Sequence, residues 1–288
     1  MSPQLIGLVA HAGKPRAGEL VRILATEFRA RGVEVLLEKE TAELIGSADG
    51  LPASELGGRC TLLVVLGGDG TILRLVHDLQ DRMCPVFGIN IGSLGFLTCL
   101  NSSAIHEAVE SICAKKFVLS ERTLLTVTVE REGEVYSQHT GLNDAVISRG
   151  ELSRLIKLDT WIGSEELTQY NADGLIISTP TGSTAYSLSA GGPVLLPESG
   201  VFVITPICPH VLTNRSVIVA DQSQITVKPI AGQTNVVLMV DGQEPVRMQE
   251  GDIIKIRKSP HSLPLAMLRE MSFSEVLRQK LKWSGSAV

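Results

Sequence analysis

The sequence predicts two structural domains, an α/β domain built on a parallel sheet and a second domain made almost entirely of β-strands. Up to about residue 115, short apolar runs alternate with segments in which apolar residues recur at helical spacing. Beyond Lys116 the chain changes to short strand-like runs separated by turn residues. A chain of 288 residues is long enough to form two domains of ordinary size.

Four short apolar runs predict the parallel strands of the first domain, at residues 5–10, 33–37, 61–66 and 85–89. The alternation of these strands with helical segments favours a Rossmann-like arrangement. We therefore expect an α/β domain over residues 1–118.

Helical patterns follow three of these strands. Apolar residues at helical spacing predict a helix over residues 20–28, and Gly32 ends it. A second helix is expected to begin near Ile72, directly after a glycine-rich turn. A third should begin at a serine N-cap, Ser102 or Ser103.

Short strand-like runs predict an all-β second domain of the β-sandwich type over residues 119–260. Alternation in residues 126–130 predicts one strand, and a turn at residues 131–134 leads to the next. Further strands are predicted at residues 155–162, 175–178, 201–205, 216–219, 224–227, 236–240 and 253–256.

The C-terminal segment, residues 261–288, is predicted to be helical again. Ser272 and Glu275 have the spacing of a capping box, and residues 276–281 would give the helix one apolar face. Because a single helix cannot bury such a face by itself, we expect it to pack back onto the first domain.

The composition argues against several classes of protein. A net charge of −5 provides no general attraction for nucleic acid or for an anionic membrane. No apolar run approaches the ~20 residues that a bilayer span requires, and the N-terminus lacks the charged start of a signal peptide. The five cysteines form no CxxC pair, so we expect reduced, buried thiols in a cytoplasmic protein.

The run GGDGT at residues 67–71 directly follows the predicted strand at residues 61–66. Glycines let backbone N–H groups approach a phosphate, and Asp69 lies where a sugar hydroxyl could reach it, so the motif predicts phosphoryl transfer. It is neither a GxGxxG fingerprint nor a Walker A loop. The alternative is an ordinary turn that needs positive φ, with Asp69 as a helix cap.

Four other polar motifs interrupt the second domain. Five Ser/Thr hydroxyls between residues 179 and 187 could donate to ribose or phosphate oxygens, or the segment could be a loop opening a short helix capped by Thr181 or Ser183. Asn143 and Asp144 interrupt apolar strand residues. Two further motifs are the run YNADG at residues 170–174 and the run DGQ at residues 241–243. All three of these short motifs could equally be turns.

Five motifs in this order resemble those of the bacterial NAD kinases, ATP-dependent enzymes that convert NAD to NADP. They are GGDGT at 67–71, GSLGFL at 92–97, LND at 142–144, DGLIISTPTGSTAYS at 173–187 and DGQ at 241–243. The resemblance covers nearly the whole chain. The GGDGT turn also occurs in diacylglycerol-type lipid kinases and 6-phosphofructokinases, whereas TPTGSTAY is more particular to NAD kinases.

The resemblance implies that Asp69 is the catalytic base, which accepts the proton of the 2′-hydroxyl of the adenosine ribose of NAD. Gly68 and Gly70 would allow close approach of the ATP phosphates. Arg74 would reach a phosphate, unless it is a solvated surface residue. The loop of Phe96 would line the nicotinamide side of the NAD site, unless Phe96 belongs to the core.

Further implied contacts to NAD lie in the second domain. Asn143 and Asp144 would contact the ribose and adenine, although most relatives have Glu at the position of Asp144. Tyr186 would stack on a base. The other implied contacts are Arg154, Asn171, Asp173, Thr184, Ala185, Ser187, Leu188, Ser189 and Gln243.

The resemblance also implies the substrates ATP and NAD, a divalent cation such as Mg²⁺ held mainly through the ATP phosphates, and a homodimer or homotetramer built through the β domain. One alternative is a lipid or sphingoid-base kinase, for which residues 278–283 are the only candidate for a basic membrane-binding helix. The other is a non-catalytic NAD or NADP sensor, which the intact Asp69 disfavours.

Overall fold

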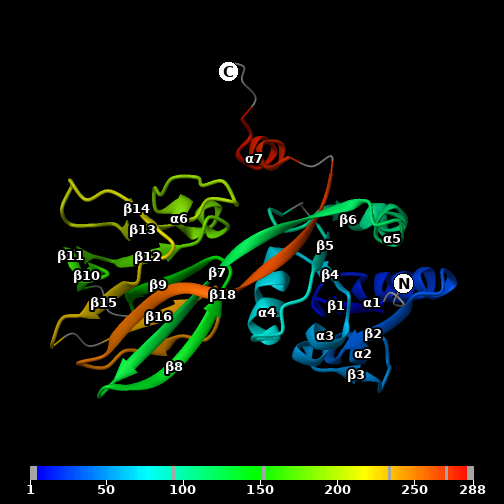
Figure 1. Ribbon diagram of the computed structural model, residues 1–288, viewed down its shortest axis with the longest axis horizontal. Coiled ribbons are helices and arrows are strands. Elements are labelled where there is room, and N and C mark those ends of the chain that lie inside the picture. The colour runs from blue at the N-terminus through cyan, green and yellow to red at the C-terminus, as the bar shows by residue number, and fades with distance from the viewer. Residues whose placement is uncertain (1–4, 93–94, 151–153, 233–234, 270–271, 284–288) are drawn as a thin grey trace. The chain divides into compact units, whose positions relative to one another are not determined.

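The computed structural model describes residues 5–92, 95–150, 154–232, 235–269 and 272–283 (Figure 1). The chain divides into a first unit, residues 1–121 with 263–288, and a second unit, residues 122–262. Two long strands, β7 (Phe117–Arg131) and β18 (Ile253–Leu268), contribute residues to both units.

The first unit is built on a parallel sheet with the strand order β5-β4-β1-β2-β3. From β1 the chain adds two strands on one side and then two on the other, so the order reverses between β1 and β4. Leu265 of β18 extends the sheet by pairing in parallel with Val86 of β5. The bounds are β1 (Leu5–Ala10), β2 (Glu34–Glu38), β3 (Gly50–Leu51), β4 (Leu62–Gly67), β5 (Val86–Asn90) and β6 (Leu100–Asn101).

Helices bury their apolar faces against this sheet. Leu24 and Phe28 of α1, for example, are fully buried in one core with Ile6 of β1 and Val64 of β4. The bounds are α1 (Ala17–Ala30), α2 (Lys39–Leu44), α3 (Ala53–Arg59), α4 (Asp69–Leu79), the 3₁₀ turn η1 (Ser102–Ala104) and α5 (Ile105–Cys113).

The predicted α/β domain with a parallel sheet is confirmed, with two corrections at helix starts. Helix α4 begins at Asp69 rather than near Ile72. The turn before α5 is capped by Asn101, whose side-chain oxygen accepts from the N–H of Ser103 at 3.3 Å, so neither predicted serine is the cap. An amide oxygen caps as well as a hydroxyl, which is why sequence did not separate them.

The second unit is a sandwich of two sheets, which confirms the predicted β-rich domain. One sheet has the antiparallel order β14-β13-β12-β9-β16-β17; in the other, β11, β10, β15 and β18 are successive neighbours, and β7 pairs with β18 and β8. Val127 of β7, Ile147 of β9 and Leu158 of β10 are fully buried together in the core between the sheets. The remaining strands are β8 (Glu134–Gly141), β9 (Asp144–Arg149), β10 (Ile156–Ile162), β11 (Glu165–Ala172), β12 (Gly174–Ser178), β13 (Val201–Ile207), β14 (Val217–Ala220), β15 (Ile225–Pro229), β16 (Val236–Val240) and β17 (Val246–Arg247).

The last residues are not helical throughout. Strand β18 continues to Leu268, and only α7 (Phe273–Leu281) is helical among the described residues after it. The predicted capping box is confirmed, because the N–H of Glu275 donates to Ser272 Oγ and the N–H of Ser272 donates to Glu275 Oε2, both at 3.2 Å. The ring of Phe273 lies 6.4 Å from that of Phe96, so α7 contacts the rest of the first unit.

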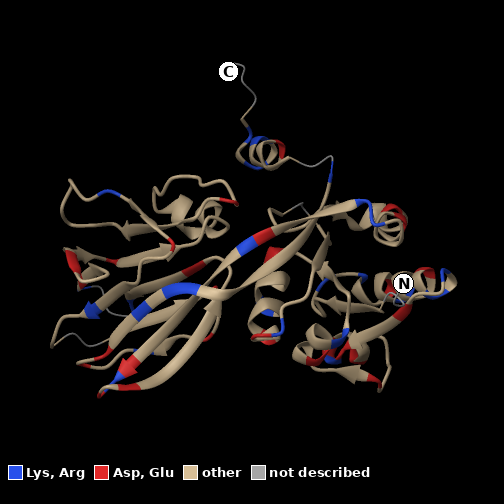
Figure 2. Ribbon diagram, in the orientation of Figure 1, with Lys and Arg blue, Asp and Glu red and all other residues tan. Residues whose placement is uncertain are grey.

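None of the five cysteines, all of which the structure describes, forms a disulfide, as expected. Cys84 and Cys99 are buried, but Cys208 is exposed in the loop after β13, so the prediction of buried thiols is wrong there. Acidic and basic residues are interspersed over both units (Figure 2). None of the helices in the described part of the chain has the length and apolar character needed to span a bilayer.

Candidate active site

A cavity of about 440 Å³ lies in the first unit where the strand order reverses. Ligands of doubly wound α/β folds bind at this position, because the loops after the two strands diverge there and leave a crevice. One wall is the loop after β1, and the other is the first turn of α4. The lining residues are His11, Ala12, Gly13, Lys14, Glu40, Gly68, Gly70, Thr71 and Arg74.

The glycines of the GGDGT motif bring α4 close to the end of β4. A Cβ on Gly67 would lie 2.1 Å from Thr71 Oγ1, and a Cβ on Gly70 would meet nothing within 4 Å. None of the three glycines, all of them described, has positive φ, so the alternative of a left-handed turn is wrong. The first N–H groups of a helix lack intrahelical acceptors and carry partial positive charge, so this open end of α4 suits a phosphate.

The Asp69 carboxylate is held by the loop that follows β5. The N–H of Phe96 donates to Oδ2 at 2.8 Å, and the N–H of Leu97 donates to Oδ1 at 3.0 Å. Asp69 is therefore not an ordinary helix cap, because its side chain binds another loop instead of its own helix. Each carboxylate oxygen keeps a further lone pair for a ligand proton.

Charged side chains and a histidine line the cavity beside these groups. Arg74 pairs with Glu40 of α2 and lines the cavity, which favours the phosphate contact over a solvated surface arginine. His11 Nδ1 accepts the N–H of Gly13 at 3.0 Å, which fixes the ring beside the loop. Lys14 adds a second cation. His11 and Lys14 were not predicted; the sequence signal for Lys14 was the glycine-lysine pair at residues 13–14, shortly after the strand predicted at residues 5–10.

Phe96 serves the site through its backbone. Its ring is half-buried near that of Phe273, and its N–H donates to Asp69 Oδ2. Ser93 and Leu94 of the same predicted motif lie outside the described residues.

In the second unit, Asp241 organises the segment from Leu142 to Asp144. The N–H of Leu142 donates to Asp241 Oδ2 at 2.6 Å, and the N–H groups of Asn143 and Asp144 donate to Oδ1 at 2.8 and 2.9 Å. Asp241 and Gly242 have φ of 49° and 70°, as the predicted turn requires. The turn interpretation was correct but missed this second role.

Asp144 is 6% exposed, and its carboxyl faces the charge of Asp241. Burial, followed by repulsion from Asp241, raises the pKa of Asp144 to about 7. Near neutral pH this carboxyl therefore exists in both protonated and ionised forms.

The hydroxyl-rich loop contributes more to structure than predicted. A Cβ on Gly182 would lie 2.1 Å from Asn143 O, so glycine brings the loop directly against Asn143. Ser183 Oγ donates to Pro180 O at 2.7 Å, and Ser187 Oγ lies 3.0 Å from Thr205 Oγ1. Thr181 and Ser183 were the predicted caps, but neither side chain caps the 3₁₀ turn η2 (Gly182–Thr184).

The accessible part of this loop lies around α6 (Tyr186–Ser189). Tyr186 is 47% exposed, which leaves its ring available for stacking, and Ser189 is exposed, whereas Ser187 is fully buried. The structure thus separates the predicted contacts in this stretch into accessible and buried side chains.

The other predicted contacts are distributed over the second unit. Asp173 pairs with Arg149 at 2.8 Å. Asn171 belongs to β11, not to a turn, and its carbonyl accepts from the N–H of His210 at 2.8 Å. Gln243 lies in the turn after Asp241, and Arg154 is exposed.

Comparison with protein families resolves the class of the chain. The model of the ATP-NAD kinase N-terminal domain matches residues 6–117, and that of the ATP-NAD kinase C-terminal domain matches residues 142–268. The NAD kinase of Solibacter usitatus is 41% identical over 277 residues, which cover 96% of each chain. The chain belongs to the NAD kinase family. The NAD kinase of Geobacter sulfurreducens is also 41% identical, over 96% of this chain and 98% of the relative.

Solved structures agree with this family assignment. Yeast NADH kinase complexed with NADH has a TM-score of 0.88 and 27% identity, with 99% of this chain and 89% of that chain covered. An NAD kinase from Archaeoglobus fulgidus in complex with ATP shares the fold, with a TM-score of 0.75, 24% identity and coverage of 97% and 99%.

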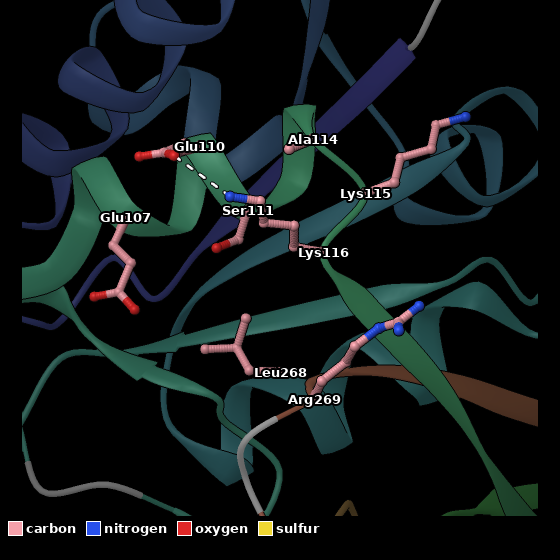
Figure 3. Close-up of a pocket in the computed structure, with 8 residues that line it drawn as sticks. All are labelled: Glu107, Glu110, Ser111, Ala114, Lys115, Lys116, Leu268 and Arg269. Atoms are coloured by element: carbon pink, nitrogen blue, oxygen red, sulfur yellow. Dashed lines mark ion pairs between the residues drawn. The ribbon is translucent and has the colours of Figure 1, made fainter.

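A larger cavity in this NAD kinase family member, of about 560 Å³, lies at the C-terminal end of α5 (Figure 3). Its Lys116 points to Glu110, with Nζ 3.7 Å from Oε1. The carbonyl end of a helix carries partial negative charge, so this cavity suits a phosphate less than the one at α4. Its lining residues are Glu107, Glu110, Ser111, Ala114, Lys115, Lys116, Leu268 and Arg269.

Proposed function

We propose that the protein transfers the γ-phosphoryl group of ATP to the 2′-hydroxyl of the adenosine ribose of NAD, with Asp69 as the general base. The family assignment supports the reaction. The observation that carries the role of Asp69 is its fixed carboxylate, which the N–H groups of Phe96 and Leu97 orient at the open end of α4.

The donor phosphates are proposed to occupy the 440 Å³ cavity. Gly70 offers a backbone N–H without a side chain in the way, whereas the N–H of Gly68 donates to Thr71 Oγ1 at 3.3 Å. Lys14 and Arg74 supply positive charge. Phosphoryl transfer depends mainly on positioning and on charge neutralisation, which are the two contributions that such a cavity makes.

The proton then has a defined destination. The ribose O2′ forms a bond to the γ-phosphorus while the bond from that phosphorus to the bridging oxygen of ADP breaks. The hydroxyl proton passes to a carboxylate oxygen of Asp69 as the new bond forms. Because both oxygens are already oriented by backbone donors, the base needs no rearrangement before the reaction.

NAD is proposed to bind through groups of the second unit. Asn143 and Asp144, held by Asp241, would contact the ribose and adenine, and Tyr186 would stack on a base. The remaining proposed contacts are Phe96 in the first unit and Arg154, Asn171, Asp173, Thr184, Ala185, Ser187, Leu188, Ser189 and Gln243 in the second.

A divalent cation is proposed to bind together with ATP. Among the described residues, no group of three or more His, Cys, Asp or Glu side chains is placed to hold a metal ion. This fits Mg²⁺, which commonly takes one or two carboxylates plus substrate phosphates, and Asp69 and Glu40 are the carboxylates near the cavity. When bound, the cation neutralises charge on the triphosphate.

The protein is further proposed to be a cytoplasmic homo-oligomer. Five cysteines without a disulfide support a reducing compartment. Exposed apolar side chains on the second unit, including Leu212 at 88% and Ile218 at 51%, support association through this unit. Light scattering with chromatography measures the oligomeric state directly.

The central experiment is to incubate the purified protein with ATP, Mg²⁺ and NAD and to measure NADP. NADP formation supports the proposal. Binding of NAD without turnover would instead indicate a sensor, and phosphorylation of a lipid in liposomes without NADP formation would indicate a lipid kinase.

A further inference from the structure

Asn90 is a buried residue whose amide nitrogen has no hydrogen-bond partner among the residues that the structure describes. It is 3% exposed at the end of β5, and its Nδ2 is unsatisfied. Burying an amide without a partner is unfavourable, and buried polar groups are normally paired. The position therefore requires an explanation.

The side chain of Asn90 faces the first turn of α4. In the sheet register Asn90 lies beside Gly67 of β4, and the N–H of Ile91 donates to Gly67 O at 2.8 Å. A Cβ on Gly68 would lie 3.5 Å from Asn90 Oδ1. A rotation of the amide by about 180° exchanges its oxygen and nitrogen, so Nδ2 can also face this point.

Two neighbours of Asn90 belong to the proposed reaction. Gly68 lines the cavity at the N-terminus of α4, and Asp69 follows it. The loop that holds Asp69 begins directly after β5, of which Asn90 is the last residue. The amide thus lies beside Gly68 at the helix end that attracts phosphate, in the residue after which the chain leads to Phe96 and Leu97.

We propose that Asn90 binds the phosphoryl group that is transferred, by donating a hydrogen bond from Nδ2 to one of its non-bridging oxygens. This inference rests on the proposed function. Nδ2 has no partner among the described residues, and an oxygen of the phosphoryl group would provide one. A neutral donor fits the role because it binds a phosphate oxygen without competing with Asp69 for the proton.

The test replaces Asn90 by leucine, which has nearly the same shape and no polar atom. We expect kcat/KM for ATP to fall by roughly tenfold or more and KM for NAD to stay within about twofold. The melting temperature of the ligand-free protein should be unchanged or higher, because the variant no longer buries an unsatisfied amide. Asn90→Asp, which presents only acceptors when ionised, should lose more activity than Asn90→Leu.

A matched control is Thr160→Val in β10 of the second unit. Thr160 is also fully buried, and its Oγ1 also lacks a partner among the described residues, but it lies in a sheet interior with no proposed ligand. Its replacement should leave kcat/KM for ATP unchanged.

The outcomes separate a ligand contact from a structural role. Wild-type kcat/KM for ATP in Asn90→Leu would overturn the proposal. A lower melting temperature together with weaker binding of both ATP and NAD would also overturn it, because it would indicate a structural role. If Asn90→Leu does not fold, Asn90→Ser and Asn90→Ala are compared by calorimetry with a non-hydrolysable ATP analogue. Asn90→Ser keeps a small donor and should bind the analogue more tightly than Asn90→Ala. Equal affinities would overturn the proposal. Failure of the wild-type protein to make NADP would refute the proposed function instead.

Discussion

A Cβ on residue 95 would lie 1.9 Å from Asp69 Oδ1. The loop after β5 can therefore donate two hydrogen bonds to the Asp69 carboxylate only because residue 95 is glycine. The obstructed atom is the end of a side chain, so an added methyl group would move the carboxylate instead of the backbone.

Gly95→Ala is accordingly expected to reduce kcat by about 10- to 100-fold, because a displaced base is no longer aligned with the acceptor hydroxyl. Its free energy of unfolding should fall by about 1 kcal/mol, because the hydrogen bonds to the Asp69 carboxylate are weakened. Steady-state kinetics and urea unfolding measure both. Gly200→Ala is the control, since its Cβ would lie an ordinary 3.9 Å from Asp221 Oδ2; an equal loss of activity there would contradict the argument.

Asp69→Asn should lose turnover by about 10²-fold or more, because the amide cannot accept the ribose proton. The amide also presents N–H to one of the two backbone donors, from Phe96 or Leu97, so the unfolding free energy should fall by about 1 kcal/mol. Calorimetric NAD affinity should remain near the wild-type value. Wild-type turnover would remove Asp69 from the mechanism.

Asp241→Asn should weaken NAD binding without affecting the proposed base, Asp69. The amide nitrogen would replace one of the two oxygens that together accept three N–H groups, and the segment holding Asn143 would loosen. A loss of about 1–3 kcal/mol in unfolding free energy and a rise in KM for NAD are expected. An unchanged KM for NAD would indicate that this segment does not contact the dinucleotide.

Stability should depend on pH through Asp144. Its folded-state pKa of about 7 lies above its ordinary value near 4, so the folded protein holds a proton that the unfolded chain releases between these values. The unfolding free energy should therefore fall as pH rises from about 4 to about 7, by up to ~1.4 kcal/mol per pH unit from this group, and level off above.

The variant Asp144→Asn provides the comparison for this pH dependence. It should be more stable than the wild type at pH 8 and should show a smaller slope between pH 4 and pH 7. Parallel stability profiles of the two proteins would show that another group causes the dependence.

Activity should require a divalent cation, because phosphoryl transfer from ATP depends on neutralising the charge of the triphosphate. Exhaustive chelation should abolish NADP formation, and added Mg²⁺ should restore it. Undiminished turnover after chelation would eliminate the metal from the proposal.

The elements that sequence predicted well are those determined by local pattern. The strand at residues 61–66 is an unbroken apolar run, and β4 occupies Leu62–Gly67. Ser272 and Glu275 form the capping box that their spacing indicates. Short elements such as α2, α3 and β3 were missed, because they carry too few residues for a period to be recognised.

Contacts between distant residues could not be predicted in this way. The hydrogen bonds from Phe96 and Leu97 to Asp69 join residues 27 and 28 positions apart, and those to Asp241 span 97 to 99 positions. A turn signal at Asp241 describes only the local backbone and says nothing about which distant N–H groups its carboxylate accepts. The roles of the site residues in binding and catalysis stay predictions until the variants are measured.

Strand β18 has a consequence for synthesis on the ribosome. Leu265 pairs with Val86, and the carbonyl of Ala266 accepts a hydrogen bond from the Cys99 thiol, so the first unit needs residues that are made after the second unit. Translation therefore leaves the part of β5 that pairs with Leu265 open until the second unit has been synthesised. Until then, either chaperone binding or rapid translation must keep this exposed strand edge from pairing with other chains.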